Sequence, residues 1–223
     1  MERVKQEQGF TLIEMIGVLA VIAILVALLL PKVFEIMAES KANALVAAVR
    51  TYETSVVDYY SDVNSLLPLT AAGVPTAEAT GDSATAISLP ARLTLDSSDP
   101  LAAPANGGSW PVFRGPYLAK FVSAVPPGLG TGVFMPTTDS PIAYGTATDS
   151  TNLGWDLNND GKSDIPTSNV VYVTFTGISD ADFAKVDAII DPGMGSSAAE
   201  IAVRGRVKYD VGTDVMMIYI NHG

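Results

Sequence analysis

Gly9-Phe10-Thr11-Leu12-Ile13-Glu14 opens an apolar stretch that continues almost unbroken to Leu30 and decides the architecture of the chain. From Phe10 to Leu30 the sole charged residue is Glu14. At a rise of about 1.5 Å per residue, a helix of this stretch is roughly 31 Å long, which matches the hydrocarbon core of a bilayer. The sequence therefore predicts a membrane-spanning helix near the N-terminus.

Glu14 is costly in such a helix and needs a partner. A carboxylate at the bilayer centre costs about 2.5–3.5 kcal/mol, and less near an edge. The apolar stretch contains no cation, but cleavage after Gly9 would create an α-amino group on Phe10. That amine can meet Glu14 of a parallel helix staggered by about one turn, and buried ion pairs are best known for fixing register. We therefore expect a membrane-stored helix that later packs against copies of itself.

The hexapeptide 9–14 resembles the processing site of type IV pilins and of the pseudopilins of type II secretion. The resemblance implies cleavage after Gly9 by a prepilin peptidase and N-methylation of Phe10. It also implies that Glu14 pairs with the amino terminus of the neighbouring subunit during assembly. Pro31 stands where many family members carry a helix-kinking proline. The alternative is an ordinary single-span anchor; a cleaved secretory signal is disfavoured because the apolar run exceeds about 7–15 residues.

The same resemblance implies an α+β pilin fold, in which the second half of a long N-terminal helix packs on a small antiparallel sheet of three to five strands. We divide the chain into a leader (1–9), a transmembrane and assembly helix (10–31), an amphipathic continuation of that helix (32–63) and an extracytoplasmic globular domain (64–223). Apolar residues recur at three- and four-residue steps between Val33 and Val63. This periodicity indicates one buried stripe, with Pro31 kinking the helix rather than ending it.

Composition excludes several classes of function. The 223 residues carry a formal charge of -11, which does not attract nucleic acid but suits an exported domain and divalent cations. Cysteine is absent, so no disulfide and no thiol chemistry is possible. The one histidine, His222, lies at the C-terminus. Because no nucleophile, base and orienting group share a recognisable spacing, we expect no enzyme.

The sequence in the middle of the chain predicts secondary structure less clearly. Residues 64–110 are rich in Ala, Thr, Ser, Gly and Pro, which predicts a long surface loop with a short strand near Ala86–Leu89 or Ala91–Leu95. Such a loop could be a display surface or a solvated connector. Gly115-Pro116-Tyr117-Leu118 resembles a segment of major pseudopilins, and the proline there predicts a short helix over 115–121 that packs on the core.

One loop has the spacing of a calcium site. Oxygen-bearing groups recur at alternate positions, a glycine follows, and a further carboxylate closes the series; the ligands would be Asp156, Asn158, Asp160, the Lys162 carbonyl and Asp164. Thr167 stands where an EF-hand places a bidentate Glu, so Asp139 or Asp149 would have to supply that ligand. Major pseudopilins of type II secretion also bind structural calcium in their C-terminal region. An Asn-Asp-Gly surface turn is the alternative.

For the last third of the chain the sequence predicts three strands and one helix. Val170–Thr176 is β-branched and aromatic, and two more strands are predicted over Ile201–Tyr209 and Val215–Ile220 with a turn between them. A helix is predicted from Ser179, its N-cap, to Ile190.

The sequence thus predicts a structural subunit of a type IV pilus-like filament or a type II secretion pseudopilus. Its partners would be like subunits, a prepilin peptidase, an inner-membrane assembly platform and membrane lipid, with calcium as a structural cofactor. Arg3 and Lys5 favour a cytoplasmic N-terminus, which places the globular domain in the periplasm. The alternative is a membrane-tethered binding module that does not polymerise and binds through residues 64–110.

Overall fold

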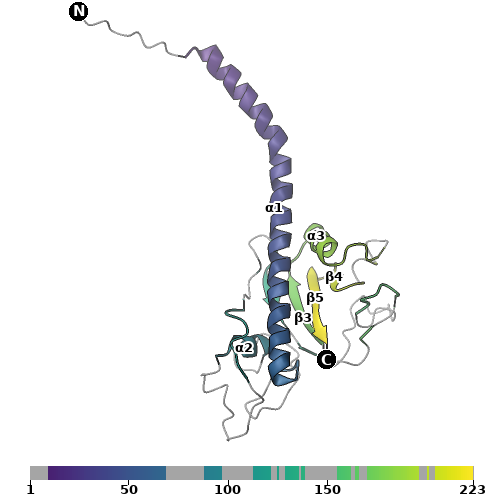
Figure 1. Ribbon diagram of the computed structural model, residues 1–223. Coiled ribbons are helices and arrows are strands. Elements are labelled where there is room, and N and C mark those ends of the chain that lie inside the picture. The colour runs from purple at the N-terminus through teal and green to yellow at the C-terminus, as the bar shows by residue number, and fades with distance from the viewer. Residues whose placement is uncertain are drawn as a thin grey trace, which may run out of the picture. The chain divides into compact units, whose positions relative to one another are not determined.

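The computed structural model has two compact units, Met1–Ser40 and Lys41–Gly223. It describes residues 10–68, 88–96, 113–121, 125, 129–135, 137–138, 155–161, 164–165, 170–195, 200 and 204–222 (Figure 1). The leader, with Gly9, lies outside the described residues, as do most of the predicted surface loop and Lys162, Thr167, Asp139 and Asp149.

Helix α1 covers Leu12–Val63 and continues through Pro31 without a break, as predicted. A proline has no N–H to donate to the carbonyl four residues earlier, so it bends a helix where flanking residues keep helical preference. The axis of α1 bends in its purple, N-terminal part (Figure 1). In the first unit this helix is long and apolar enough to cross a membrane, and none of its most apolar window is buried within the protein.

From Lys41 onward α1 supplies one side of the core of the second unit. Its buried apolar residues follow a helical repeat along one face: Ala42, Leu45, Val46, Val49, Tyr52, Val56, Tyr59 and Val63. They form one hydrophobic cluster with sheet residues such as Val171, Val173 and Ile218. The predicted stripe is confirmed at Leu45, Val49, Tyr52, Val56 and Val63, which pack on the sheet. It was wrong at four other positions, which are exposed: Val33, Ile36, Met37 and Tyr60.

The sheet is antiparallel and has the order β1-β3-β5-β4, with β2 also pairing with β3. Its strands are β1 (Gly132–Phe134), β2 (Thr137–Thr138), β3 (Val170–Thr176), β4 (Val207–Asp210) and β5 (Val215–His222). The predicted bounds of β3 are confirmed, and β5 extends two residues beyond its predicted end. The α+β architecture, a long helix on a small antiparallel sheet, is therefore confirmed and is consistent with a pilin fold.

Strand β4 begins later than predicted, at Val207, because the chain turns just before it, and it ends one residue beyond the predicted end. Residues 201–203 of the predicted strand lie outside the described residues. Gly205 has a φ of +82°, and residues 204–206 form bends. The backbone N–H groups of Arg206 and Val207 donate to Asp191 Oδ2 at 2.6 and 2.7 Å. These donors are fixed to the end of α3 instead of joining a strand partner.

Helix α3 (Asp180–Ile190) begins where the sequence predicts. Ser179 is its N-cap, and the hydroxyl accepts a hydrogen bond from the Asp182 N–H at 3.2 Å. The cap satisfies one of the N–H groups that the first turn leaves without a partner.

Two local predictions were wrong. Where a strand was predicted over Ala91–Leu95, helix α2 covers Leu89–Thr94, because Ser88 caps its first turn and Pro90 suits a first-turn position. The start of the alternative strand, residues 86 and 87, lies outside the described residues. No helix forms over the described residues of 115–121. The N–H groups of Tyr117 and Leu118 instead donate to the Leu93 carbonyl of α2, each at 2.9 Å, and Gly115–Pro116 is a cis peptide. A contact between segments thus replaces the local helix.

Candidate functional site

The first candidate site is the N-terminal end of α1. Thr11 precedes the helix, and its N–H and hydroxyl both donate to Glu14 Oε2, at 2.8 and 2.7 Å. The Glu14 N–H donates back to Thr11 Oγ1 at 3.3 Å. This reciprocal pair is a capping box, which satisfies backbone donors at the start of a helix.

The capping box corrects one step of the sequence argument. We expected the partner of Glu14 to come from chain cleavage or from another molecule, since no cation lies in the apolar stretch. Thr11 already gives that carboxylate two donors within its own chain. The signal for it, a Thr followed three residues later by Glu, stands in the opening hexapeptide and was missed.

Beyond the cap, α1 presents an apolar surface all round. The large apolar side chains from Phe10 to Leu30 are exposed, with Phe10 at 81% and Leu28 at 72%. A Cβ placed on Gly17 would meet no atom within 4 Å. Exposed apolar surface of this extent is what lipid or other helices cover.

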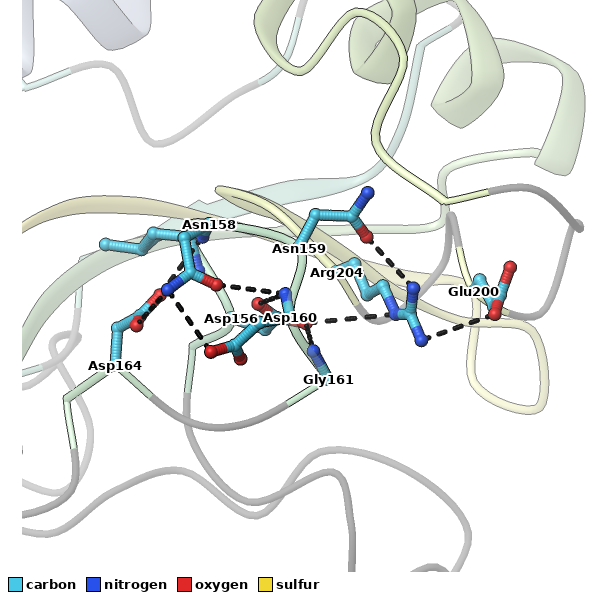
Figure 2. Close-up of polar contacts among 9 residues, drawn as sticks. Asp156, Asn158, Asn159, Asp160, Gly161, Asp164, Glu200 and Arg204 are labelled. Atoms are coloured by element: carbon cyan, nitrogen blue, oxygen red, sulfur yellow. Dashed lines mark hydrogen bonds and ion pairs between the residues drawn. The ribbon is translucent and has the colours of Figure 1, made fainter.

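The second candidate site is the loop 155–164, whose described residues do come together (Figure 2). Asp156 Oδ1 accepts the Asp160 N–H at 3.0 Å, and its Oδ2 accepts the Gly161 N–H at 2.8 Å. Gly161 has a φ of +81°, so it makes the sharp turn that its position in the spacing requires. Asp156 is buried, whereas Asp160 is exposed.

Asn158 and Asp164 close the loop. Asp164 Oδ2 accepts the N–H groups of Leu157 and Asn158 at 2.7 and 3.0 Å. The Asn158 side-chain Nδ2 lies between two carboxylates, 2.9 Å from Asp164 Oδ1 and 3.5 Å from Asp160 Oδ2 (Figure 2). Its Oδ1 accepts the Asp160 N–H at 2.9 Å.

The donor set of this loop fits calcium in its chemistry, since three carboxylates and one amide oxygen are hard oxygen ligands. The observed arrangement of these side chains is not that of a calcium site. Within the described part of the chain, no three His, Cys, Asp or Glu side chains are grouped so that they could hold a metal ion. Amide N–H groups turn toward the carboxylates instead, so a cation would require Asn158 to reorient.

Arg204, which the sequence argument did not consider, reaches this loop from the segment before β4. Its Nε lies 3.8 Å from Asp156 Oδ2, and its Nη1 donates to Asn159 Oδ1 at 3.0 Å. Its Nη2 lies 3.3 Å from Glu200 Oε1 (Figure 2). The Gly205 N–H also donates to the Asp156 carbonyl at 2.7 Å. No sequence spacing signals this contact, because the loop and Arg204 are far apart along the chain.

Trp155 anchors the start of the loop in a small second core. It packs with Ile165, Val170 and Tyr219 and is fully buried. Lys208 of β4 is also fully buried, and its Nζ lies 4.9 Å from the centroid of the Trp155 ring. Burial lowers the pKa of Lys208 to about 8, although Asp156 acts in the opposite direction.

Comparisons with known proteins agree with the N-terminal signal. A family model described as the prokaryotic N-terminal methylation motif matches residues 4–30. The long helix and the antiparallel sheet that follow the matched residues are consistent with a pilin fold. The chain carries the signature of type IV pilins and pseudopilins. No curated protein and no solved structure matches it.

Proposed function

We propose that this chain is a structural subunit of a type IV pilus-like filament or a type II secretion pseudopilus. The methylation motif supports a pilin-type subunit, and the motif family is structural rather than enzymatic. The observation that carries the proposal is a 52-residue helix whose second half packs on the sheet while its first half leaves its apolar side chains exposed. A helix of this kind can be stored in lipid and later packed among other helices.

In this proposal the precursor spans the inner membrane once, with its N-terminus in the cytoplasm and its globular domain in the periplasm. A prepilin peptidase cleaves after Gly9, and the new amino group on Phe10 is methylated. The amine of one subunit then meets Glu14 of a neighbour on the assembly platform. Within one chain Glu14 accepts hydrogen bonds from Thr11, which lowers the cost of holding its carboxylate in lipid before assembly. Pro31 bends the helix, because it has no N–H to donate to the carbonyl four residues earlier.

The processing step is tested by Gly9→Val, with Gly17→Val as the matched control. Gly17 lies within the same apolar helix, and a side chain there meets no atom of its own chain. We expect Gly9→Val to leave only the full-length precursor in membranes, whereas Gly17→Val is shortened like the wild type. A shortened Gly9→Val protein would contradict cleavage at this site.

The pilus and the pseudopilus differ in where the mature chain is found. Abundant mature chain in sheared surface material would indicate a pilus, and mature chain confined to washed membranes would indicate a short pseudopilus. A membrane-tethered binding module predicts an unprocessed monomer in both fractions.

A second proposal concerns the loop 155–164, which we suggest binds calcium as a structural cofactor. The alternate spacing of the oxygen-bearing side chains of Asp156, Asn158, Asp160 and Asp164, with Gly161 at the turn, supports it. Titration calorimetry with CaCl₂ on the full chain in detergent tests it, comparing wild type with Asp160→Asn and with the exposed helix variant Asp58→Asn. We expect weaker binding in Asp160→Asn alone. Equal binding in all three proteins, or no binding in the wild type, would contradict the proposal.

A further inference from the structure

A half-open groove lies in the second unit, between α1, the end of α3 and the segment before β4. Its lining combines apolar and charged side chains: Val49, Ile189, Ile190, Arg50, Glu53 and Arg206. We call it the arginine groove. Its volume of about 70 Å³ is room for several waters or for one small side chain.

The arginine groove has more positive than negative charge. Arg206 Nη2 donates to Glu53 Oε1 and, at 3.1 Å, to the Tyr219 carbonyl, whereas its buried Nε has no hydrogen-bond partner within the described residues. Arg50 forms no ion pair with any residue that the structure describes. Burial lowers the pKa of Arg206, and the nearby charge of Arg50 acts in the same direction. One carboxylate thus faces two guanidinium groups, in a chain whose formal charge is -11.

The turn between β4 and β5 has the complementary chemistry. Among the described residues after α1, Val211 is the one large apolar side chain that is exposed, at 63%. Asp210 and Asp214 flank it along the chain. The Gly212 N–H and the Thr213 hydroxyl donate to the Asp210 carboxylate at 2.9 and 2.8 Å, so the turn is held in one conformation. This hairpin tip, residues 210–214, therefore presents an apolar side chain between two acids.

The hairpin tip cannot enter the arginine groove of its own chain. Arg206 precedes β4 and Val211 follows it, so groove and tip lie at opposite ends of this strand. At about 3.3 Å per residue they are roughly 15 Å apart. The pairing of β4 with β5 fixes this separation. A second copy of the chain can supply the tip without any change in the fold.

We propose that the hairpin tip of one copy docks in the arginine groove of a second copy, with Val211 against the apolar lining. The carboxylates of Asp210 and Asp214 then face the excess positive charge of the groove. The inference rests on the proposed function, because it requires like chains to lie side by side. The contact joins two different surfaces, so each added copy leaves one tip and one groove open. Contacts of this kind extend into open helical filaments.

Disulfide trapping tests the contact, because the chain contains no cysteine of its own. Cells produce two differently tagged full-length chains, one with Val211→Cys and the other with Ile190→Cys. Membranes and sheared surface material are oxidised, and mixed-tag dimers are measured on non-reducing gels. A disulfide requires Cα atoms within about 7 Å, so we expect dimers of the two tags only where a tip meets a groove. The control pairs Val211→Cys with Val57→Cys, which is exposed on α1 outside the groove.

The charge complementarity is tested in the Ile190→Cys chain. Arg50→Glu reverses one charge of the groove, and Lys120→Glu makes the same change at an exposed residue outside it. We expect Arg50→Glu to lower the yield of mixed-tag dimers about tenfold, because it places like charges opposite each other. Lys120→Glu should give the wild-type yield. The wild-type yield should also fall as NaCl is raised, since salt screens exposed charges.

Formaldehyde ladders of like chains report polymerisation through any contact and separate the possible failures. A ladder without Cys-trapped dimers of the 190 and 211 variants would overturn the inference and leave the filament proposal intact. Equal dimer yields with Arg50→Glu and Lys120→Glu would overturn the charge pairing of tip and groove. Neither a ladder nor a dimer in any fraction would overturn the filament proposal, and the docking of the tip with it.

Discussion

Lys208 is a charged residue in a buried, largely apolar environment. It is fully buried, its Nζ has no hydrogen-bond partner within the described residues, and its neighbours are the Trp155 ring and the charge of Asp156. Removing a charge from water is costly even when an aromatic face partly offsets the loss. The buried ammonium group of Lys208 therefore lowers the free energy of unfolding.

We predict that Lys208→Met raises the free energy of unfolding by about 1–4 kcal/mol at pH 7, because methionine keeps the apolar stem and removes the buried charge. Burial lowers the pKa of Lys208 to about 8, so above that pH the folded state loses a proton that the unfolded chain keeps to about 10.5. Wild-type stability should therefore rise with pH through this window, and the advantage of the variant should shrink. Denaturant unfolding of wild type and Lys208→Met at pH 7 and pH 10 measures the difference in their unfolding free energies. A variant less stable than wild type at pH 7 would contradict the account.

Asp187 gives the opposite pH dependence. Its Oδ1 is buried without a hydrogen-bond partner within the described residues, and burial, together with the nearby Asp191, raises its pKa to about 7. Between about pH 4 and pH 7 the folded state therefore binds a proton that the unfolded chain has released, so stability falls as pH rises through this window.

We predict that Asp187→Asn flattens this slope and melts a few degrees above wild type at pH 8, with little difference near pH 4. Asp191, whose pKa burial raises to about 6, should leave a smaller residual slope. Asp58→Asn on the exposed face of α1 is the control and should follow the wild-type curve. A wild-type melting temperature that is constant from pH 5 to pH 8 would contradict the assignment.

At the scale of elements, the N-cap of α3 is a local interaction that can be tested alone. Ser179→Ala removes the acceptor for the Asp182 N–H and should cost about 1 kcal/mol of unfolding free energy. Thr54→Ala is the control, because that exposed hydroxyl donates to the Arg50 carbonyl of its own helix. Denaturant unfolding of the two variants should separate them; equal stabilities would show that the cap contributes nothing.

Local patterns predicted the elements that depend on local chemistry. The helical extent of α1, the β-branched run of β3 and the Ser179 cap needed no distant partner, and their predictions are confirmed. The buried stripe of α1 is confirmed only where the helix meets the sheet, because apolar periodicity does not tell which part of a helix has a partner to pack on. The segment 115–121 was predicted as a helix and was wrong, because the Leu93 carbonyl from a distant segment takes its N–H groups. The sequence of residues 115–121 alone does not predict such a contact.

In the candidate sites, too, features that depend on local sequence could be predicted, and contacts between distant segments could not. The spacing in the loop 155–164 predicted a calcium site, with an Asn-Asp-Gly turn as the alternative. Gly161 makes the sharp turn that both interpretations need, and calcium binding stays a prediction. The approach of Arg204 could not be predicted, since it depends on how the segment before β4 passes the loop. The Thr11 capping box could have been predicted, because its whole signal lies within four residues.

At the scale of the whole molecule, a Glu14 variant can distinguish precursor processing from filament assembly. Glu14→Ala removes the carboxylate that would meet the amine of the next subunit, and it also removes the side-chain half of the capping box. We predict normal shortening of the precursor with filament yield reduced to a small fraction of wild type. Thr11→Val, which disrupts the capping box but keeps the carboxylate, is the control and should still assemble. Immunoblots of membranes and sheared material measure both steps, and normal filament yield from Glu14→Ala would contradict the register argument.

The central claim is that the opening hexapeptide is a processing site and the helix after it is an assembly element. Intact mass of the protein recovered from membranes and from sheared surface material tests it most directly. We predict a chain that begins at Phe10, lacks residues 1–9 and carries one added methyl group. Full-length, unmethylated protein in both fractions would contradict the claim and leave a membrane-tethered module as the better description.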